Sequence, residues 1–394
     1  MNTAARLARI QPSATLAVNA KAQELKAQGR QIISLAVGEP DFPTPAHVVA
    51  AAKAALDAGH TRYTPVPGIP ALRQAVAAQY GRFYGAKAES ANVIVSNGGK
   101  QVLYNLLMAL LNPGDQVLIP GPYWVSYPDM TLLADGEPVI VPASAEKGFL
   151  LDPEDLERAW TPKAKALILN TPSNPTGCHY SQERLDALAD WAEKRGVFVI
   201  SDEVYDRLVY APAKPSTLAR RFEAKPESYA LVGALSKSFC MTGWRLGWAL
   251  AHPDLVKAMN KIQGQSTSNV CSFVQHAAVT ALEGPWDVVE EMKVSFQRRR
   301  DLALATIRSW PGASCPVPDG AFYLFPVLDA FYDAEAPNSA ALCTRILEKA
   351  GVALVPGSAF GDDRCIRFSY AVADETLKTA LDQVSKIYLV GANA

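Results

Sequence analysis

The sequence predicts an α/β fold whose larger domain contains a doubly wound, mostly parallel sheet. Four short apolar runs, at residues 116–120, 166–170, 197–201 and 229–233, recur with helical segments between them. This alternation is typical of a parallel sheet with right-handed crossovers. The chain has 394 residues, of which 49% are hydrophobic. This allows a sizeable core and, at about 100–200 residues per domain, two domains.

Composition argues against several other classes of protein. The formal net charge of -1 gives no electrostatic case for binding nucleic acid or a membrane surface. The longest apolar runs are too short to span a bilayer, and the first residues lack the apolar core of a signal peptide. The six cysteines are scattered without a C-x-x-C pair, and the five histidines show no metal-ligand spacing. We therefore expect a cytoplasmic protein with reduced thiols and no metal.

The first elements in the chain are a helix and a rigid loop. Apolar residues at helical spacing predict a helix over 14–28, starting after Pro12-Ser13. An extended run over 32–37 then ends in a loop over 38–45, which has three prolines in six residues and therefore no regular structure. At its start, Gly38 allows the backbone to come close to a ligand. The alternative is that the loop over 38–45 is only a linker between two elements.

A helix is expected over 48–58, and the loop that follows it contains Tyr63. Without further context, a tyrosine in such a loop is expected to be only partly exposed. Next comes a strand over 92–96, a turn with two glycines and a helix over 100–111. A glycine turn that leads into a helix exposes unpaired N–H groups, which form an anion site. Gly99 and Lys100 lie at this point.

Each later parallel strand is followed by a candidate ligand residue, and ligands in such sheets bind at the carboxyl ends of the strands. Each candidate also has a plainer interpretation, as a core tryptophan, a turn or a helix cap. The candidates are Trp124 after 116–120, Asn174 after 166–170, and Asp202 and Tyr205 after 197–201.

The fourth strand is followed by Lys237, and Arg245 comes eight residues later. A lysine in apolar surroundings loses its charge easily, and its neutral amine forms Schiff bases with carbonyls. An arginine fork is suited to a phosphate. An aldehyde and a phosphate together indicate pyridoxal 5'-phosphate, although a bare spacing of this kind is more often a solvated lysine and a structural arginine.

The run Ser236-Lys237-Ser238-Phe239-Cys240-Met241-Thr242-Gly243-Trp244-Arg245-Leu246-Gly247 closely resembles the lysine motif of class I aminotransferases, which are fold type I pyridoxal-phosphate enzymes. Six further motifs match that family in order, so that the resemblance covers about residues 10–388. They include Gly-Glu-Pro-Asp-Phe at 38–42, Asn-Pro-Thr-Gly at 174–177 and the segment 263–269.

The resemblance implies which residues hold the cofactor ring. Lys237 would form the Schiff base and then move the α-proton of the substrate. Asp202 would keep the pyridine nitrogen protonated, and Trp124 would stack on the ring. Asn174 and Tyr205 would hydrogen-bond its phenolic oxygen.

The resemblance also places the cofactor phosphate. Gly99, Lys100, Ser236 and Arg245 would bind it, together with Tyr63 of a neighbouring subunit, so that the active site requires a homodimer. Ala234 stands where the family pattern usually has glycine or serine, and one phosphate hydroxyl is therefore missing.

Substrate residues follow in the same way. Gly38 and Arg367 would bind the α-carboxylate, with Trp124 and Asn174 beside it. An internal salt bridge is the other interpretation of Arg367. Ser13, Thr15 and Lys100 resemble a bacterial branch of aspartate aminotransferases, in which they bind the side-chain carboxylate.

These features favour transfer of the amino group of L-aspartate to 2-oxoglutarate. Aromatic amino acids, alanine, kynurenine and prephenate are the alternatives. Gln11 stands where the prephenate-using members of this branch carry a lysine. This makes prephenate a less favoured substrate than aspartate.

The predicted domains are an N-terminal arm with part of the small domain (1–45), a large cofactor-binding domain (46–290) and a small domain (291–394). A long helix is expected over about 286–310 and leads into the small domain. Its three consecutive arginines, Arg298-Arg299-Arg300, are expected to form a solvent-exposed face. Near the end of the chain, Arg364 is expected to be exposed.

Overall fold

The structure is a computed structural model that describes residues 3–390. Its strands are β1 (Ile33–Ser34), β2 (Val93–Ser96), β3 (Gln116–Gly121), β4 (Glu137–Pro142), β5 (Ala164–Asn170), β6 (Phe198–Asp202), β7 (Tyr229–Ala234), β8 (Gly247–Leu250), β9 (Tyr323–Leu324), β10 (Val352–Ala353), β11 (Val355–Pro356) and β12 (Ile366–Ser369). Its helices are α1 (Ala14–Ala27), α2 (Ala46–Asp57), α3 (Pro70–Tyr84), α4 (Gly99–Leu110), α5 (Ser126–Leu133), α6 (Pro153–Ala159), α7 (Gln182–Arg195), α8 (Ala219–Ala224), α9 (Leu235–Ser238), α10 (Pro253–Ser266), α11 (Ser272–Glu283), α12 (Asp287–Arg308), α13 (Ser339–Ala350) and α14 (Asp374–Val390).

Seven strands form the central sheet, in the order β2-β8-β7-β6-β5-β3-β4. The strands from β7 to β4 along this order are all parallel, while β8 runs antiparallel to both of its neighbours. The four predicted parallel strands begin and end within two residues of their expected positions. The prediction of a mostly parallel α/β sheet is confirmed.

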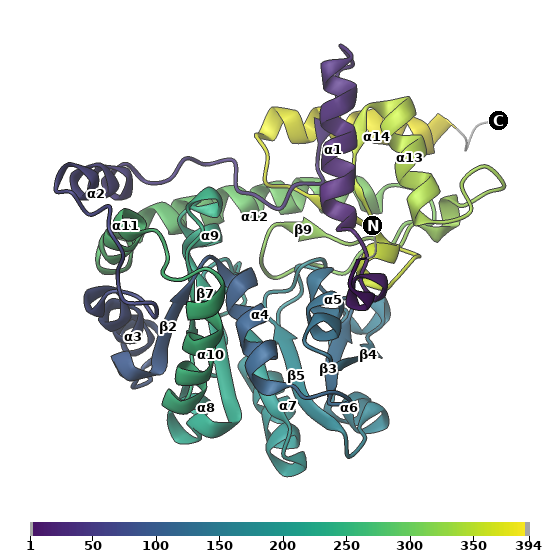
Figure 1. Ribbon diagram of the computed structural model, residues 1–394. Coiled ribbons are helices and arrows are strands. Elements are labelled where there is room, and N and C mark those ends of the chain that lie inside the picture. The colour runs from purple at the N-terminus through teal and green to yellow at the C-terminus, as the bar shows by residue number, and fades with distance from the viewer. Residues whose placement is uncertain (1–2, 391–394) are drawn as a thin grey trace.

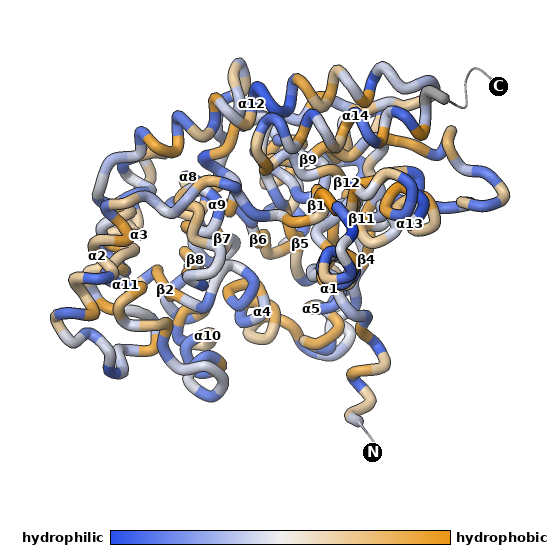
Figure 2. The backbone as a smooth tube through the Cα atoms, turned by 90° about the horizontal axis from the view of Figure 1, so that it is seen from above, coloured by the Kyte–Doolittle hydropathy of each residue, from blue (hydrophilic) through white to orange (hydrophobic). Residues whose placement is uncertain are grey.

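Helices cover both faces of this sheet (Figure 1). Side chains of a strand alternate between the two faces, so that Ile94 packs with α4, α5 and α10, whereas Val93 and Val95 pack with the core of the opposite face, which includes α3, α7 and α11. Figure 2 shows the strands as mainly hydrophobic, whereas α12 alternates hydrophobic and hydrophilic residues along its length.

A second layer lies above the sheet in Figure 1 and contains α12, α13 and α14. It holds the antiparallel sheet β11-β12-β9 and the two-stranded parallel sheet β1-β10. Because β1 pairs with β10, with Ile33 opposite Val352, the N-terminal segment is joined to the C-terminal layer. Of the extended run expected over 32–37, only Ile33–Ser34 is a strand.

The expectation of a solvated arginine face on α12 is wrong for two of the three residues. Arg298 is exposed, but Arg299 and Arg300 are buried. Arg299 pairs with Asp41 and Asp374, and Arg300 donates to the carbonyl oxygen of Pro318 at 3.0 Å. The pattern on α12 alone could not show this, because the covering groups come from distant parts of the chain. Within residues 3–390, no helix is long and apolar enough to cross a membrane.

Candidate active site

A cavity of about 260 Å³ lies where the carboxyl ends of the parallel strands meet the second layer. The strands β5, β6 and β7 contribute Asn170, Asp202 and Ala234, while Tyr323 and Arg367 come from the second layer. All of the predicted site residues except Tyr63 line this cavity: Ser13, Thr15, Gly38, Gly99, Lys100, Trp124, Asn174, Asp202, Tyr205, Ser236, Lys237, Arg245 and Arg367.

Lys237 extends from α9, the single helical turn that follows β7. Burial, together with the positive charges of Arg367 and Arg245, lowers the pKa of Lys237 to about 8, although the carboxylates of Glu39 and Asp202 act in the opposite direction. The Nζ of Lys237 donates to the carbonyl oxygen of Gly38 at 2.6 Å. A lysine with such a pKa is readily deprotonated, and its amine is then a nucleophile or a base.

Asp202 is the last residue of β6 and is buried. The hydroxyl of Tyr127 donates to its Oδ2 at 2.7 Å, and the N–H of Val204 donates to its Oδ1 at 3.3 Å. Burial raises the pKa of Asp202 to about 6, although both hydrogen bonds and the charge of Lys237 lower it. The carboxyl group is therefore mostly ionised at neutral pH and can hold a positive group next to it.

Two tyrosines form a hydrogen-bonded pair on the second-layer side of the pocket. The hydroxyl oxygens of Tyr205 and Tyr323 are 2.8 Å apart. Burial, followed by the influence of Tyr323, raises the pKa of Tyr205 well above its ordinary value, so that its hydroxyl keeps its proton. A side chain at Gly38 would meet the hydroxyl of Tyr323, which explains why the loop needs a glycine there.

Arg367 lies in β12 and is 2% exposed. Its Nη1 donates to Oδ1 of Asn174 at 2.9 Å and its Nη2 to the carbonyl oxygen of Ala36 at 2.5 Å, while its Nε has no partner among the described residues. Its guanidinium also packs over the ring of Tyr323, 4.8 Å from the centroid. Within the described residues no carboxylate pairs with Arg367, so the internal salt bridge that the sequence left open is not seen there. A buried arginine in this state is suited to a ligand carboxylate.

The opposite end of the pocket is built around the start of α4. Gly98, just before the helix, has φ 87°, and a Cβ there would collide with the guanidinium of Arg245. Arg245 donates to the carbonyl oxygens of Thr242 at 2.7 Å and Asn97 at 3.3 Å. The predicted anion site therefore combines a helix N-terminus with a guanidinium, and Ser236 lies in the same cavity.

Lys100 lies beside this end of the pocket, with its Nζ 5.0 Å from the ring centroid of Trp124. Desolvation lowers the pKa of Lys100, and the charge of Arg245 lowers it further. Ser13 and Thr15, at the start of α1, also line the cavity. Besides Lys237 and Arg245, the pocket thus has a buried cation at Arg367 and a more exposed one at Lys100.

Tyr63 does not reach the pocket of its own chain and is 92% exposed. Its predicted contact with a cofactor phosphate therefore cannot be made within one chain as it is folded here, and a second chain would have to bring the tyrosine to the phosphate.

Comparison with known proteins gives the family. A family model described as "Aminotransferase class I and II" matches residues 30–384. The chain belongs to the aminotransferase class I and II family. It is 46% identical over 385 residues to an aspartate/prephenate aminotransferase of Cereibacter sphaeroides (96% of each chain), and 44% identical over 390 residues to an aspartate aminotransferase of Geobacillus stearothermophilus (98% of each chain). The solved aspartate aminotransferase of Thermus thermophilus with maleate is 41% identical, with a TM-score of 0.93, covering 98% of this chain and 100% of that one.

Membership in the class I and II family confirms the predicted resemblance and the predicted cofactor, pyridoxal phosphate. The pocket of this aminotransferase fits that group chemically. Lys237 offers an amine with a lowered pKa for its aldehyde, Asp202 a buried carboxylate for its ring nitrogen, and Arg245 a guanidinium beside a helix N-terminus for its phosphate.

Sequence reasoning about this aminotransferase missed Tyr127 and Tyr323. Tyr127 comes three residues after Trp124, in the first turn of α5 beyond the carboxyl end of β3, and its place after that strand could have indicated it. Tyr323 lies in a two-residue strand of the second layer, where no local pattern marks it. Asn170 and Thr242 also line the cavity and were not predicted.

Proposed function

We propose that this aminotransferase transfers the amino group of L-aspartate to 2-oxoglutarate, giving oxaloacetate and L-glutamate. The observation that carries the proposal is the presence of two basic side chains, Arg367 and Lys100, in the same pocket as Lys237 and Arg245. Aspartate and 2-oxoglutarate both carry two carboxylates, and each carboxylate can then pair with one cation. The names of the relatives, aspartate aminotransferase and aspartate/prephenate aminotransferase, support this substrate class.

In this proposal, different side chains bind the two carboxylates of the substrate. Arg367 binds the α-carboxylate, with Asn174 holding its guanidinium in place and Gly38 leaving room beside it. Ser13, Thr15 and Lys100 bind the side-chain carboxylate. The substrate is thereby oriented with its α-carbon facing Lys237, whose lowered pKa suits it to take the α-proton and return it.

When bound, pyridoxal phosphate supplies the electron sink for the negative charge that remains after the α-proton leaves. Asp202 favours this state because its carboxylate can hold a proton on the ring nitrogen. Asn174 and Tyr205 offer hydrogen bonds to the phenolic oxygen, and Trp124 offers a flat surface. Gly99, Lys100, Ser236 and Arg245 bind the phosphate.

The proposal includes a homodimer in which Tyr63 of one subunit reaches the phosphate site of the other. The high exposure of Tyr63 in the single chain supports this role. It also includes the division into an N-terminal arm (1–45), a large domain (46–290) and a small domain (291–394), which the pairing of β1 with β10 supports. The cytoplasmic location stays a prediction.

Prephenate is the second candidate because it also carries two carboxylates and one of the similar proteins is named for it. Gln11 stands where prephenate-using members carry a lysine, and its backbone N–H donates to Asp129 at 3.4 Å. We therefore place prephenate below aspartate, and aromatic amino acids, alanine and kynurenine below both.

The test is product identification with purified protein and added pyridoxal phosphate. L-Aspartate with 2-oxoglutarate should give equal amounts of oxaloacetate and L-glutamate, and Lys237→Ala should give neither. Each alternative substrate is then offered in competition. Faster turnover of an aromatic amino acid, alanine or kynurenine than of aspartate would overturn the proposed specificity.

A further inference from the structure

One short segment of backbone contacts both Lys237 and Arg367. The carbonyl oxygen of Ala36 accepts from Nη2 of Arg367 at 2.5 Å, and that of Gly38 accepts from Nζ of Lys237 at 2.6 Å. Because the two carbonyls are only two residues apart, the position of this segment determines where the amine of Lys237 lies relative to the guanidinium of Arg367.

The same segment is tied to the chain that follows Lys237. The hydroxyl of Thr44 donates to the carbonyl oxygen of Cys240 at 2.8 Å and accepts from Nε1 of Trp244 at 3.1 Å. The hydroxyl of Thr242 is hydrogen-bonded to the carboxylate of Glu39. Residues 36–44, which we call the bridging segment, therefore connect the Lys237 side of the pocket to the Arg367 side.

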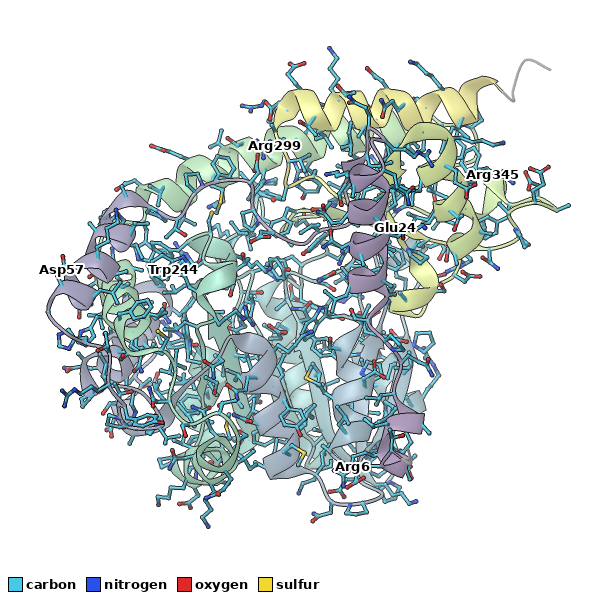
Figure 3. The ribbon with its side chains drawn as sticks, turned by 45° about the horizontal axis from the view of Figure 1, so that its top comes forward. Arg6, Glu24, Asp57, Trp244, Arg299 and Arg345 are labelled. Atoms are coloured by element: carbon cyan, nitrogen blue, oxygen red, sulfur yellow. The ribbon has the colours of Figure 1, made fainter. Side chains whose placement is uncertain are left out.

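Arg299 of α12 holds the bridging segment from outside the pocket. Its Nη1 and Nη2 donate to the two carboxylate oxygens of Asp41, at 2.7 and 3.1 Å. Its Nε donates to Asp374, at the start of α14, at 2.6 Å. The Arg299 side chain is 7% exposed, and its guanidinium packs over the ring of Phe42 at 5.3 Å. Figure 3 shows Arg299 on α12, in the second layer.

The geometry of this ion pair restricts movement of the segment in more than one direction. Two parallel N–H···O bonds fix both the distance and the rotation of the Asp41 carboxylate, which a single contact would not do. Asp41 is three residues after Gly38, so there is little slack between the ion pair and the carbonyl that contacts Lys237. Arg299 itself does not line the cavity.

We propose that Arg299 is a positioning residue for amino transfer: through Asp41 it fixes the bridging segment, and the segment keeps Lys237 and Arg367 at the separation that the reaction needs. The inference rests on the proposed function, because it assigns Arg367 to the substrate's carboxylate. A role in stability alone would be fulfilled equally by the bond to Asp374 on the other side of the guanidinium.

Two pairs of variants separate these roles. Arg299→Met and Asp41→Asn remove the bidentate pair. Asp374→Asn removes the other partner of Arg299 and leaves the bridging segment held, and Arg298→Met is the matched exposed control on the same helix. We expect kcat to fall about 10- to 100-fold in the first pair, as for a displacement of about 1 Å at a reacting group. It should stay within about twofold of the unchanged protein in the second pair.

A second readout needs no substrate. The absorbance of bound pyridoxal phosphate would depend on protonation of the Lys237 nitrogen, and the bridging segment sets how far that nitrogen lies from the positive charge of Arg367. The apparent pKa in an absorbance titration should therefore shift in Arg299→Met and Asp41→Asn but not in Asp374→Asn. Melting temperatures measured alongside show how much each variant destabilises the fold. If Arg299→Met does not fold, Asp41→Asn, which keeps the shape of the side chain, gives the same comparison.

Two results would overturn the inference. One is an unchanged kcat and an unchanged absorbance titration in Arg299→Met or Asp41→Asn. The other is an equal loss of kcat in Asp374→Asn at a similar fall in melting temperature, which would show a general effect on stability. Failure of the unchanged protein to use aspartate would overturn the proposed substrate only, because the titration would still decide the role of Arg299.

Discussion

Burial is the main cause of the shifted pKa values of Lys237 and Asp202 in this pocket. Removal from water lowers the pKa of Lys237 to about 8 and raises that of Asp202 to about 6. Both values lie near neutral pH, where a base and a hydrogen-bonded carboxylate are most useful. The hydroxyl of Tyr127 keeps the pKa of Asp202 from rising further.

Tyr127→Phe tests this last contact. Loss of the hydroxyl should raise the pKa of Asp202, so that less of the carboxylate is ionised near neutral pH. A hydrogen bond to a charged group is worth about 1.5–3 kcal/mol, so we expect kcat to fall about 10- to 100-fold at pH 6 and less at pH 8. The control is Tyr123→Phe, at a neighbouring tyrosine outside this cavity. A loss that is equal at both pH values would contradict the account.

Lys100→Met tests the second cation. Without the charge near Trp124, KM for L-aspartate should rise about 10- to 100-fold, the effect of one lost charged contact. KM for L-alanine, which lacks the second carboxylate, should change little. Steady-state kinetics with both donors measures the difference, and Lys53→Met, an exposed lysine of α2, is the control. Equal rises for both donors would contradict a contact between Lys100 and the side-chain carboxylate of the substrate.

At the scale of elements, strand ends and short turns position the chemistry. The turn from β7 into α9 buries Lys237, and β6 ends at Asp202. Strand–helix alternation made the parallel sheet and its carboxyl-end residues predictable from sequence. The second layer was less predictable because its strands β1, β9, β10 and β11 have only two residues each. The burial of Arg299 depends on Asp41, 258 positions away in the sequence.

Burial of Lys237 also predicts how the stability of the cofactor-free protein depends on pH. Its pKa is about 8 when folded and 10.5 in its ordinary state. Between these values the unfolded chain holds the extra proton, so this group makes the free energy of unfolding rise with pH. The gain is fully present above pH 10.5 and has been lost once the pH has fallen to about 8. Urea unfolding at several pH values should therefore show unchanged protein gaining stability relative to Lys237→Met from pH 8 to 10. A difference that does not vary with pH in this window would contradict the pKa shift.

At the scale of the whole molecule, one chain supplies nearly the complete site. All predicted site residues except Tyr63 meet in one cavity although they come from positions 13 to 367. The spacing of the motifs indicated which residues belong to the active site. It could not show that Tyr63 lies away from the pocket of its own chain. Because Tyr63 is exposed in the single chain, we propose that it completes the site of a second subunit in a homodimer.

Mixing two inactive variants tests the shared site. Lys237→Ala removes the reactive amine, and Tyr63→Phe removes the hydroxyl that we expect to cross between subunits. In a mixed dimer, one of the two sites has both residues intact. Refolding the variants together should restore up to about half of the activity per mixed dimer, whereas each variant refolded alone is the control. If the mixture is no more active than the two variants measured separately, Tyr63 acts within its own subunit or not at all.

We propose above that this chain moves amino groups between dicarboxylate substrates on pyridoxal phosphate held by Lys237. An absorbance spectrum of the purified protein loaded with pyridoxal phosphate, followed by sequential addition of L-aspartate and 2-oxoglutarate, tests it most directly. The absorbance band of the bound aldehyde form should disappear with aspartate and return with 2-oxoglutarate. A band that responds to an aromatic amino acid but ignores aspartate would contradict the proposed substrate, and the absence of any band would contradict the role of Lys237.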